Sequence, residues 1–320
     1  MSESIGVALA TFNGERYIEQ QLESILTQTR KPDLIVVSDG GSSDHTVELC
    51  RSISKKHESI EWLILQNDHR LNVIENFKKG MSYCNSDIVF LCDQDDFWYN
   101  NKIEEYMKAF ESHSDYTVVL SDADVVDANL NKSGRTQWDS IKFNPISESP
   151  DRDYLISEML HRNIFTGMCM AYRNGTFKTA DIMSDYMLHD EAIGWFAIFK
   201  GKVGFVDKRT AAYRQHGNNA VGSSKYSKFE SIKIFKQKIK GSTIRTRNKY
   251  QDIVQLYKEN ESIQQIEYAL SFYRTRAELF DMSRFHAMSR FFSLLIKGSY
   301  KKYTSKTEHS KIKDFAYIVL

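Results

Sequence analysis

Three carboxylates stand within four residues, directly after a short apolar run. Asp93, Asp95 and Asp96 follow Ile88–Cys92, which has the length and apolar character of a buried strand. Carboxylates this close repel one another, and a hard divalent cation is the partner that makes the arrangement tolerable. Such a cation keeps open oxygen sites, which phosphate groups naturally occupy. The alternative is an acidic cap on a helix beginning near Asn101, but one cap needs only one Asp.

Two further polar groups carry weaker signals. Arg70 follows the third expected strand, where a cation can approach a diphosphate, although a solvated surface arginine is the commoner case. Asp122, Asp124 and Asp127 do not form a calcium loop, because the sixth position would be Asp127 instead of Gly and the twelfth Ser133 instead of Glu. We interpret these three residues as a strand end and turn. A place on the acceptor side of the ligand site is the alternative.

Trp98 and Trp195 each follow an acidic motif. Either side chain could shape a sugar pocket, but packing in the core is the commoner fate of a tryptophan.

The elements that must position the acidic residues follow from hydrophobic periodicity. Apolar runs alternate with amphipathic segments through the first hundred residues. Strands are predicted at Ile5–Thr11, Leu34–Ser38, Trp62–Leu65 and Ile88–Cys92, and helices at Glu15–Gln28, Asp44–Lys56 and Val73–Cys84. Four strands linked by helices predict an α/β fold with a doubly wound, mostly parallel sheet, whose ligands bind at the carboxyl ends of the strands.

The second half of the chain divides differently. A strand is expected at Thr117–Leu120, and the polar stretch Ala128–Asp153 resembles a long surface excursion. Beyond Gly222 the pattern changes to Lys- and Arg-rich segments with helical periodicity, so we predict a catalytic domain at 1–222 and a basic, mainly helical region at 223–320. Helices are expected there at Phe229–Lys240, Asn248–Tyr257, Ile263–Phe280 and Phe285–Ile296.

Composition narrows the classes of protein. The 320 residues carry 43 Lys and Arg against 42 Asp and Glu, which excludes a general polyanion binder, and 41% hydrophobic residues exclude a disordered chain. Residues 223–320 nevertheless hold 20 Lys and Arg against 9 Asp and Glu. The 4 cysteines lack metal-binding spacing, and no apolar run approaches the roughly 20 residues of a membrane span. These features predict a cytoplasmic protein with free thiols.

Five short motifs follow one another between residues 5 and 222: ATFNG from Ala10, SDGGSSD from Ser38, DQDDFW from Asp93, HD at His189 and YRQHGNN from Tyr213. Together they resemble the motifs of family 2 glycosyltransferases with the A-type (GT-A) fold. Within that family the chain resembles bacterial enzymes that add rhamnose or another hexose to cell-surface polysaccharides. Each motif alone is weak, and the order of all five over two thirds of the chain carries the resemblance.

The resemblance implies roles for these residues on the donor side. The loop formed by Ala10, Thr11, Phe12 and Asn13, together with Asp39, would line the pocket for the nucleotide base and ribose of a UDP- or dTDP-sugar. Asp93 and Gln94 would also contact the nucleotide sugar. Arg70 is a further candidate contact, because it follows the third expected strand.

The resemblance further implies a metal site and a base. Asp93 and Asp95 would be the DxD pair, with Asp96 beside them, holding Mn²⁺ or Mg²⁺ against the donor diphosphate. His216 is a further candidate ligand, although a surface or capping role is commoner for a lone histidine. Asp190 falls where the family keeps its general base; the adjacent Glu191 competes, but on a helix the two point about 100° apart and Asp190 is preferred. A helix start with an acidic first turn is the alternative reading.

The activity implied is a metal-dependent, inverting transfer of a hexose to a glycan or lipid-linked glycan acceptor. One departure matters: the family usually has a second Asp where this chain has Gly40, which puts the choice of donor in doubt. The competing class is a non-catalytic nucleotide-sugar-binding or scaffold protein in which Gly40 marks loss of the donor site.

The basic C-terminal region has two main interpretations. Phe285, Met288, Phe291, Phe292 and Leu295 repeat at helical spacing among cations, which is typical of a helix on an anionic membrane surface. Packing of the same stripe on the catalytic domain or on a second subunit is equally consistent, so homo-oligomerisation stays open. Nucleic acid is not an expected partner, because nothing resembles a base-reading module. A peripheral location at the inner face of the cell membrane would follow from the first interpretation.

Overall fold

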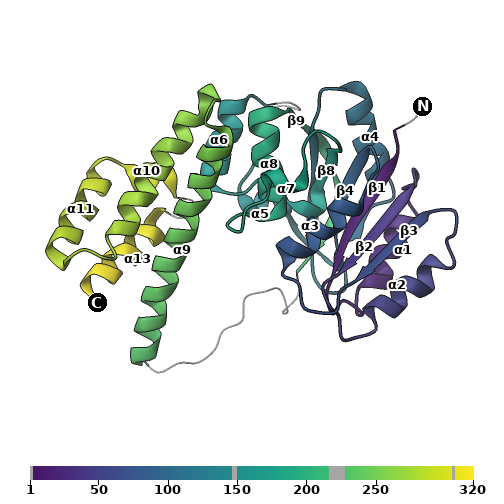
Figure 1. Ribbon diagram of the computed structural model, residues 1–320, viewed down its shortest axis with the longest axis horizontal. Helices are drawn as coiled ribbons and strands as arrows, with labels where there is room; N and C mark the ends of the chain where they lie inside the picture. The colour runs from purple at the N-terminus through teal and green to yellow at the C-terminus, as the bar shows by residue number, and fades with distance from the viewer. Residues whose placement is uncertain (1–2, 146–149, 216–227, 305–306) are drawn as a thin grey trace. The chain divides into compact units, whose positions relative to one another are not determined.

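The computed structural model describes residues 3–145, 150–215, 228–304 and 307–320. The chain divides into two compact units. The first comprises Met1–Asp151 and Ile164–Asn219, and the second Arg152–Asn163 and Ala220–Leu320 (Figure 1). The predicted boundary near Gly222 lies outside the described residues. Helix α6 (Arg152–His161) belongs with the second unit, whereas the sequence pattern placed it in the catalytic region.

A mixed sheet forms the centre of the first unit. Its strand order is β3-β2-β1-β4-β8-β6-β9-β5, with β7 paired to β6. The first four strands in this order are parallel to one another, whereas β8 is antiparallel to both of its neighbours. The bounds are β1 Ile5–Thr11, β2 Leu34–Asp39, β3 Glu61–Gln66, β4 Ile88–Asp93, β5 Phe97–Trp98, β6 Val118–Val126, β7 Lys132–Thr136, β8 Met170–Arg173 and β9 Val203–Arg214. The four strands predicted in the first hundred residues are confirmed, with ends that differ by one residue at most.

Helices cover the parallel part of the sheet on two sides. α1 (Ile18–Leu26) contacts α2 (Thr46–Ser54), and α3 (Val73–Tyr83) packs on β1 and β2. Right-handed crossovers with the order β3-β2-β1-β4 place α1 and α2 on one face and α3 on the other, as Figure 1 shows. The doubly wound arrangement is therefore confirmed. Both faces of β1 and β2 are covered, which is why their sequences are apolar without alternation.

The remaining helices of the first unit follow the parallel part. They are α4 (Lys102–Ser112), α5 (Gln137–Ile141), α7 (Thr179–Ile182) and α8 (His189–Lys200), with a short 3₁₀ turn, η1, at Gly167–Cys169. The predicted excursion over Ala128–Asp153 is wrong in part, because β7 and α5 form within it. The β7 sequence KSGRT lacks apolar residues, since this edge strand is exposed along nearly its whole length.

The second unit is helical. Besides α6 it contains α9 (Lys228–Tyr257), η2 (Glu261–Ile263), α10 (Gln264–Glu278), α11 (Arg284–Ile296), α12 (Ser299–Tyr303) and α13 (Thr307–Val319). The guanidinium of Arg276 on α10 donates two hydrogen bonds to Asp314 on α13, at 2.6 and 2.9 Å. Tyr300 donates a third to Asp314, at 2.7 Å. This fully hydrogen-bonded ion pair fixes α10, α12 and α13 against one another.

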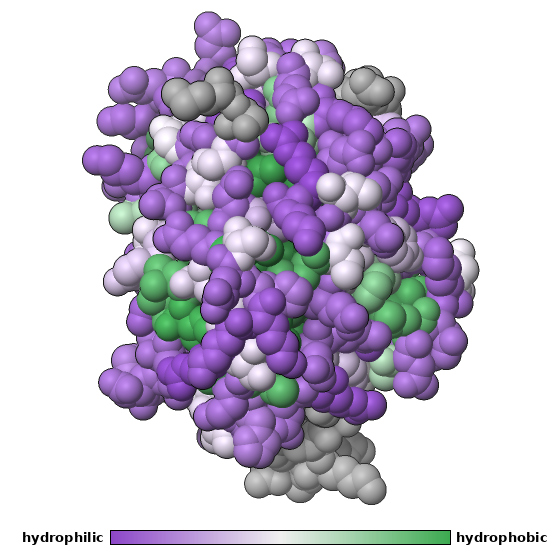
Figure 2. Space-filling view, turned by 90° about the vertical axis from the view of Figure 1, so that its right-hand side faces the viewer, coloured by the Kyte–Doolittle hydropathy of each residue, from purple (hydrophilic) through white to green (hydrophobic). Residues whose placement is uncertain are grey.

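The core cluster of the first unit lies on one face of β1, β2 and β4, where α1 and α4 pack. All four cysteines are free and buried, as their scattered spacing predicts. Among the helices of the described residues, none is both long and apolar enough to cross a membrane. Figure 2 views the side on which β3 and α2 lie in Figure 1 and shows a mainly hydrophilic surface with small, separate apolar patches.

Candidate active site

Three neighbouring strand ends bring the predicted donor-side residues together. Thr11 at the end of β1 pairs in register with Asp39 at the end of β2, and Ala10 pairs with Asp93 at the end of β4. The strand order reverses between β1 and β4, and at such a switch the loops diverge and leave a crevice at the carboxyl ends of the strands. The acidic cluster (Asp93, Asp95 and Asp96) therefore begins where a doubly wound sheet binds its ligands.

The loop after β1 is held by the side chain of Gln94. The Phe12 amide donates to Gln94 Oε1 at 2.8 Å, and Gln94 Nε2 donates to the Phe12 carbonyl at 3.0 Å. A Cβ on Gly14 would lie 2.1 Å from Gln94 Oε1, so glycine is required for this approach. Asn13 adopts a positive φ of 48°, which asparagine tolerates better than most residues. Gln94 thus sets the shape of the loop after β1 by bonding to the backbone of Phe12.

Asp39 organises the next loop. One carboxylate oxygen accepts from the backbone amides of Gly41 and Ser42, at 3.1 and 2.8 Å. The other accepts from the hydroxyls of Thr11 and Ser42, at 2.9 and 2.5 Å. Asp39 is fully buried, so these bonds supply the partners that a buried carboxylate needs. Its side chain couples the ends of β1 and β2.

Gly40 fits a crowded position. A Cβ there would lie 3.2 Å from the Asn76 amide nitrogen and 3.3 Å from the Thr11 carbonyl oxygen, which is tighter than ordinary van der Waals contact. The same Asn76 amide donates to the Thr11 carbonyl at 3.0 Å, and the Gly40 amide donates to that carbonyl at 2.8 Å. Gly40 begins the turn that leads from β2 to α2, and this turn packs against Asn76 of α3.

Arg70 lies at the same end of the sheet. Its guanidinium carbon stands 4.7 Å from the centroid of the Phe12 ring, and the arginine is exposed. This stacking holds a cation over an aromatic face beside the donor-side loop.

The acidic cluster is anchored by a residue from β9. The Arg214 amide donates to Asp96 Oδ1 at 3.1 Å, and its Nε donates to the Asp95 carbonyl at 2.7 Å. The same guanidinium reaches the Ala128 carbonyl and Gln20 Oε1, both at 2.6 Å. Arg214 is buried, and its role was missed by the sequence analysis. The only signal was its place beside His216 in the last motif, because its partners are mostly backbone groups from distant segments.

Burial and mutual repulsion raise the pKa of two carboxyls in the cluster. Burial, followed by the charges of Asp95 and Asp190, raises the pKa of Asp93 to about 7. Burial and the charges of Asp93 and Asp95 raise the pKa of Asp96 well above its ordinary range, and its Oδ2 has no hydrogen-bond partner. Burial, followed by the charges of the same three carboxylates, raises the pKa of Tyr213 to about 12. The cluster is therefore short of positive charge.

The carboxylates of the acidic cluster have the chemistry that a divalent cation needs. Such an ion binds oxygen ligands, and Asp96 Oδ2 is a buried carboxylate oxygen without a hydrogen-bond partner. Within the described ranges, however, no group of three or more His, Cys, Asp or Glu side chains is arranged to hold a metal ion. The predicted ligand His216 lies outside the described residues.

The start of α8 supplies the candidate base. Asp190 Oδ2 accepts from the Gly167 amide at 3.2 Å, and Oδ1 accepts from the Glu191 amide at 2.7 Å. Both Asp190 and Glu191 are buried, and the charge of Asp190 raises the pKa of Asp93. The candidate base therefore lies close enough to the acidic cluster for the two charges to interact. The predicted helix start is also confirmed, because α8 begins at His189.

His189 itself is structural. Its ring stacks on Phe77 of α3 with centroids 3.6 Å apart, and burial alone lowers its pKa to about 3. Trp98 and Trp195 are also fully buried, so core packing, and not a sugar pocket, accounts for both.

Comparison with known proteins agrees with this arrangement. The model of the family described as glycosyl transferase family 2 matches residues 7–179. The chain is 26% identical over 230 residues to the dTDP-rhamnosyl transferase RfbG of Shigella flexneri, covering 68% of this chain and 74% of that protein. It is 23% identical over 224 residues to the GalNAc(5)-diNAcBac-PP-undecaprenol beta-1,3-glucosyltransferase of Campylobacter jejuni, covering 69% and 68%.

Solved structures show the same fold. S. aureus TarS 1-349 in complex with UDP-GlcNAc superposes with a TM-score of 0.57 at 16% identity, covering 85% of this chain and 72% of that chain. The complex with UDP gives the same TM-score and identity and covers 98% and 89%. With its GT-A fold and a family match over more than half of its length, the chain belongs to glycosyl transferase family 2 and is a glycosyltransferase.

Proposed function

We propose that the protein is a metal-dependent, inverting glycosyltransferase that moves a hexose from a nucleoside-diphospho-sugar to a growing surface glycan. The observation that carries the proposal is a second buried carboxylate, Asp190 at the start of α8, which lies close enough to the acidic cluster at the end of β4 for its charge to raise the pKa of Asp93. A donor-side cluster facing a separate acceptor-side carboxylate is what a single displacement at a sugar carbon requires.

The donor pocket would lie over the ends of β1 and β2. Ala10–Asn13 offer backbone groups and the Phe12 ring to the base, and Asp39 holds this loop against the next one. Arg70, exposed and stacked on Phe12, would supply a cation to pair with a donor phosphate. The names of the relatives support a dTDP- or UDP-linked sugar, because one is a dTDP-rhamnosyl transferase and the solved neighbour binds UDP-GlcNAc. Rhamnose or a similar hexose is the sugar we propose.

Asp93, Asp95 and Asp96 would hold the Mn²⁺ or Mg²⁺, with His216 as a further candidate ligand. A bound cation would neutralise the negative charge that grows on the diphosphate as the bond to the sugar breaks. Arg214 keeps the cluster in place, because it anchors the Asp96 carboxylate and the Asp95 carbonyl together.

Asp190 would act as the general base. It takes the proton from the acceptor hydroxyl as that oxygen attacks the sugar carbon on the face opposite the diphosphate, so the configuration at that carbon is inverted. Its two carboxylate oxygens are oriented by the Gly167 and Glu191 amides. Glu191 is the alternative base one position along α8.

The acceptor we propose is a lipid-linked glycan at the inner face of the cell membrane. The Campylobacter relative is named for an undecaprenol-linked acceptor. In the second unit, α11 and α13 leave apolar side chains exposed beside lysines and arginines, which suits an anionic membrane surface.

The base assignment is tested by turnover. Hydrolysis of dTDP-rhamnose and of UDP-GlcNAc is measured with Mn²⁺, with water replacing the acceptor, for the wild type and for Asp190→Asn and Glu191→Gln. We expect Asp190→Asn to lower the rate by about 10²-fold or more while leaving the affinity for UDP and dTDP unchanged. Glu191→Gln should keep most of the rate. The reverse pattern would assign the base to Glu191. Loss of nucleotide affinity in Asp190→Asn would mean that Asp190 contacts the donor and is not the base for the acceptor.

A further inference from the structure

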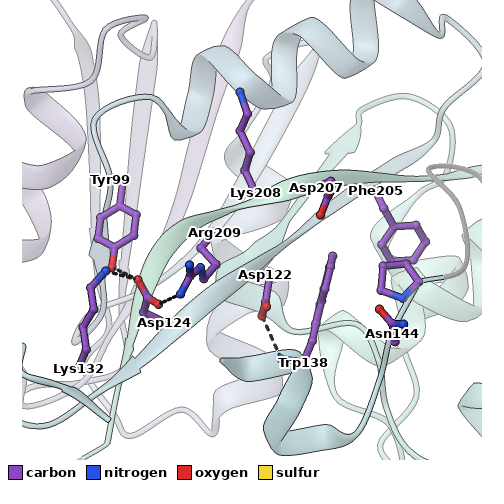
Figure 3. Close-up of a pocket in the computed structure, with 11 residues that line it drawn as sticks. Tyr99, Asp122, Asp124, Lys132, Trp138, Asn144, Phe205, Asp207, Lys208 and Arg209 are labelled. Atoms are coloured by element: carbon purple, nitrogen blue, oxygen red, sulfur yellow. Dashed lines mark hydrogen bonds and ion pairs between the residues drawn. The ribbon is translucent and has the colours of Figure 1, made fainter. Parts of the chain in front are cut away.

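A cavity lies within the first unit, and none of the acidic-cluster residues lines it. It has a volume of about 890 Å³, which is within the range of small-molecule sites. Figure 3 shows its lining, which comes from Tyr99 directly after β5, from β6, β7, α5 and β9, and from the segment after α5. The lining combines aromatic rings with charged groups. Among the lining residues are Tyr99, Asp122, Asp124, Lys132, Trp138 and Arg209.

One carboxylate of this cavity, Asp124, pairs with two of its cations. Asp124 accepts from Arg209 at 2.8 Å on one oxygen and from Lys132 and Tyr99 at 2.6 Å on the other. Burial opposes ionisation of Asp124, but these hydrogen bonds outweigh it and lower its pKa. Lys208 also lines the cavity, but its side chain points away from Asp124 in Figure 3, and its ammonium pairs with Glu105 at 2.6 Å. The cavity therefore offers hydrogen-bonding groups without an excess of positive charge, which disfavours a diphosphate and suits a neutral polar ligand.

An aromatic wall stands opposite the charged network. Trp138 packs at right angles to Phe143 with centroids 5.6 Å apart and lies 5.9 Å from Phe205. The Trp138 amide donates to Asp122 Oδ1 at 2.9 Å, which fixes α5 on β6. A rigid aromatic surface presents a negative face to the C–H groups of a sugar ring, while planar carboxylate and guanidinium groups bind its hydroxyls. Both kinds of group line this cavity.

The backbone is irregular at the same place. The pairing of β6 with β9 shifts between Ser121 and Asp122 and again between Asp122 and Ala123. Extra residues on β9 at such bulges bend the strand and redirect its side chains, and bulges are common beside functional sites. Here they bring Arg209 to the cavity wall.

β9 also joins the cavity to the acidic cluster. Arg209 lines the cavity, and Arg214 at the end of the same strand holds Asp95 and Asp96. Five residues of strand span roughly 16 Å, a distance longer than one sugar ring. A glycan whose terminal sugar lies at the cluster therefore has internal sugars within reach of the cavity.

We propose that this cavity binds a neutral sugar unit of the acceptor glycan, at a position internal to the unit that receives the transferred hexose. The proposal rests on the glycosyltransferase function proposed above. Trp138 and Arg209 are its specificity-determining residues, and neither belongs to the donor site.

The test is binding of the full chain, saturated with UDP and Mn²⁺, to a printed array of bacterial surface oligosaccharides, neutral and anionic. We expect binding to neutral oligosaccharides that persists at high salt. It should weaken about tenfold or more in Trp138→Ala. Because Trp138 is buried and its loss can disturb folding, Arg209→Ala, whose side chain is 56% exposed, provides a second variant expected to weaken binding with an unchanged melting temperature. Tyr83→Ala, an exposed tyrosine on α3 outside the cavity, is the matched control.

No binding by the wild type, binding to anionic glycans only, or binding unchanged in both cavity variants would overturn the proposal. Donor hydrolysis measured on the same preparations separates the two claims. If the wild type and the cavity variants hydrolyse donor but the array is silent, the cavity proposal alone fails. If the wild type does not hydrolyse donor, the proposed function fails.

Discussion

At the scale of single residues, the site depends on side chains that bond to the backbone of other segments. Gln94 and Asp39 were predicted to contact the nucleotide sugar, and their side chains hold the loops that follow β1 and β2. Their positions in the motifs could be predicted from the sequence. Their bonds to the β1 end could not, because Thr11 lies 28 residues from Asp39 and Phe12 lies 82 residues from Gln94, whereas the bonds of Asp39 to Gly41 and Ser42 are local.

His189 gives a prediction about stability and pH. Burial lowers its pKa to about 3 in the folded protein, against 6.5 for an exposed imidazole, so the folded ring stays neutral while the unfolded one takes a proton. The stability from this group is complete above about pH 6.5 and is lost as the pH falls from there towards about 3. Its slope is about 1.4 kcal/mol per pH unit.

Urea unfolding of the wild type and of His189→Leu at several pH values between 4 and 7.5 measures this slope. The variant should lose less stability on acidification than the wild type, whereas His45→Gln, at an exposed position, should behave like the wild type. Parallel pH profiles for wild type and His189→Leu would show that the ring is protonated in the folded protein.

At the scale of elements, α3 carries the residue that ties β1 to β2. Asn72 caps α3: its side chain accepts from the Glu75 amide at 3.0 Å, and Glu75 accepts from the Asn72 amide at 2.9 Å. One turn later, Asn76 donates to the Thr11 carbonyl and accepts from Ser38. The cap therefore sets the start of the helix that braces the donor-side loop.

Asn72→Ala should destabilise the protein by about 1 kcal/mol through loss of the capping box. Asn101→Ala is the matched control, because Asn101 stands at the N-cap of α4 without a side-chain capping bond. Urea unfolding followed by circular dichroism measures both. Equal effects of the two substitutions would mean that the capping box contributes nothing at α3.

Elements rich in apolar residues could be predicted from the sequence, and polar or interrupted ones could not. The strands β1 to β4 carry continuous apolar runs, whereas β7 is an exposed edge strand without any. α9 is one helix where two were predicted, because Gly241 interrupts the pattern. A glycine inside a helix costs only about 1 kcal/mol, and a Cβ at Gly241 would meet nothing within 4 Å.

At the scale of the whole molecule, the chain joins a mixed α/β unit to a basic helical one, and the charge difference between them could be read from the sequence. The membership of α6 could not, because its partners lie over a hundred residues away: Asp153 accepts from Gln265 at 3.0 Å. No local pattern records such a pairing.

Membrane binding by the second unit is the prediction at this scale. On α11, Phe285 is 81% and Ile296 is 86% exposed, with Arg284 and Lys297 next to them. The double variant Phe285→Ser/Ile296→Ser should lose most of the binding that the wild type shows to vesicles of phosphatidylcholine with phosphatidylserine, measured by co-sedimentation. Leu256→Ser, at an exposed position on α9, is the control. Equal binding by wild type and double variant would exclude α11 as the contact.

The central claim is that the acidic cluster at the end of β4 binds the donor diphosphate through a cation. Thermal shift of the wild type and of Asp95→Ala, with UDP or dTDP and with or without Mn²⁺, tests it most directly, and Asp68→Ala at an exposed position is the control. We expect the nucleotide to raise the melting temperature of the wild type and of the control only when Mn²⁺ is present, and Asp95→Ala to show no such rise. A metal-independent rise that is the same in all three proteins would contradict the account.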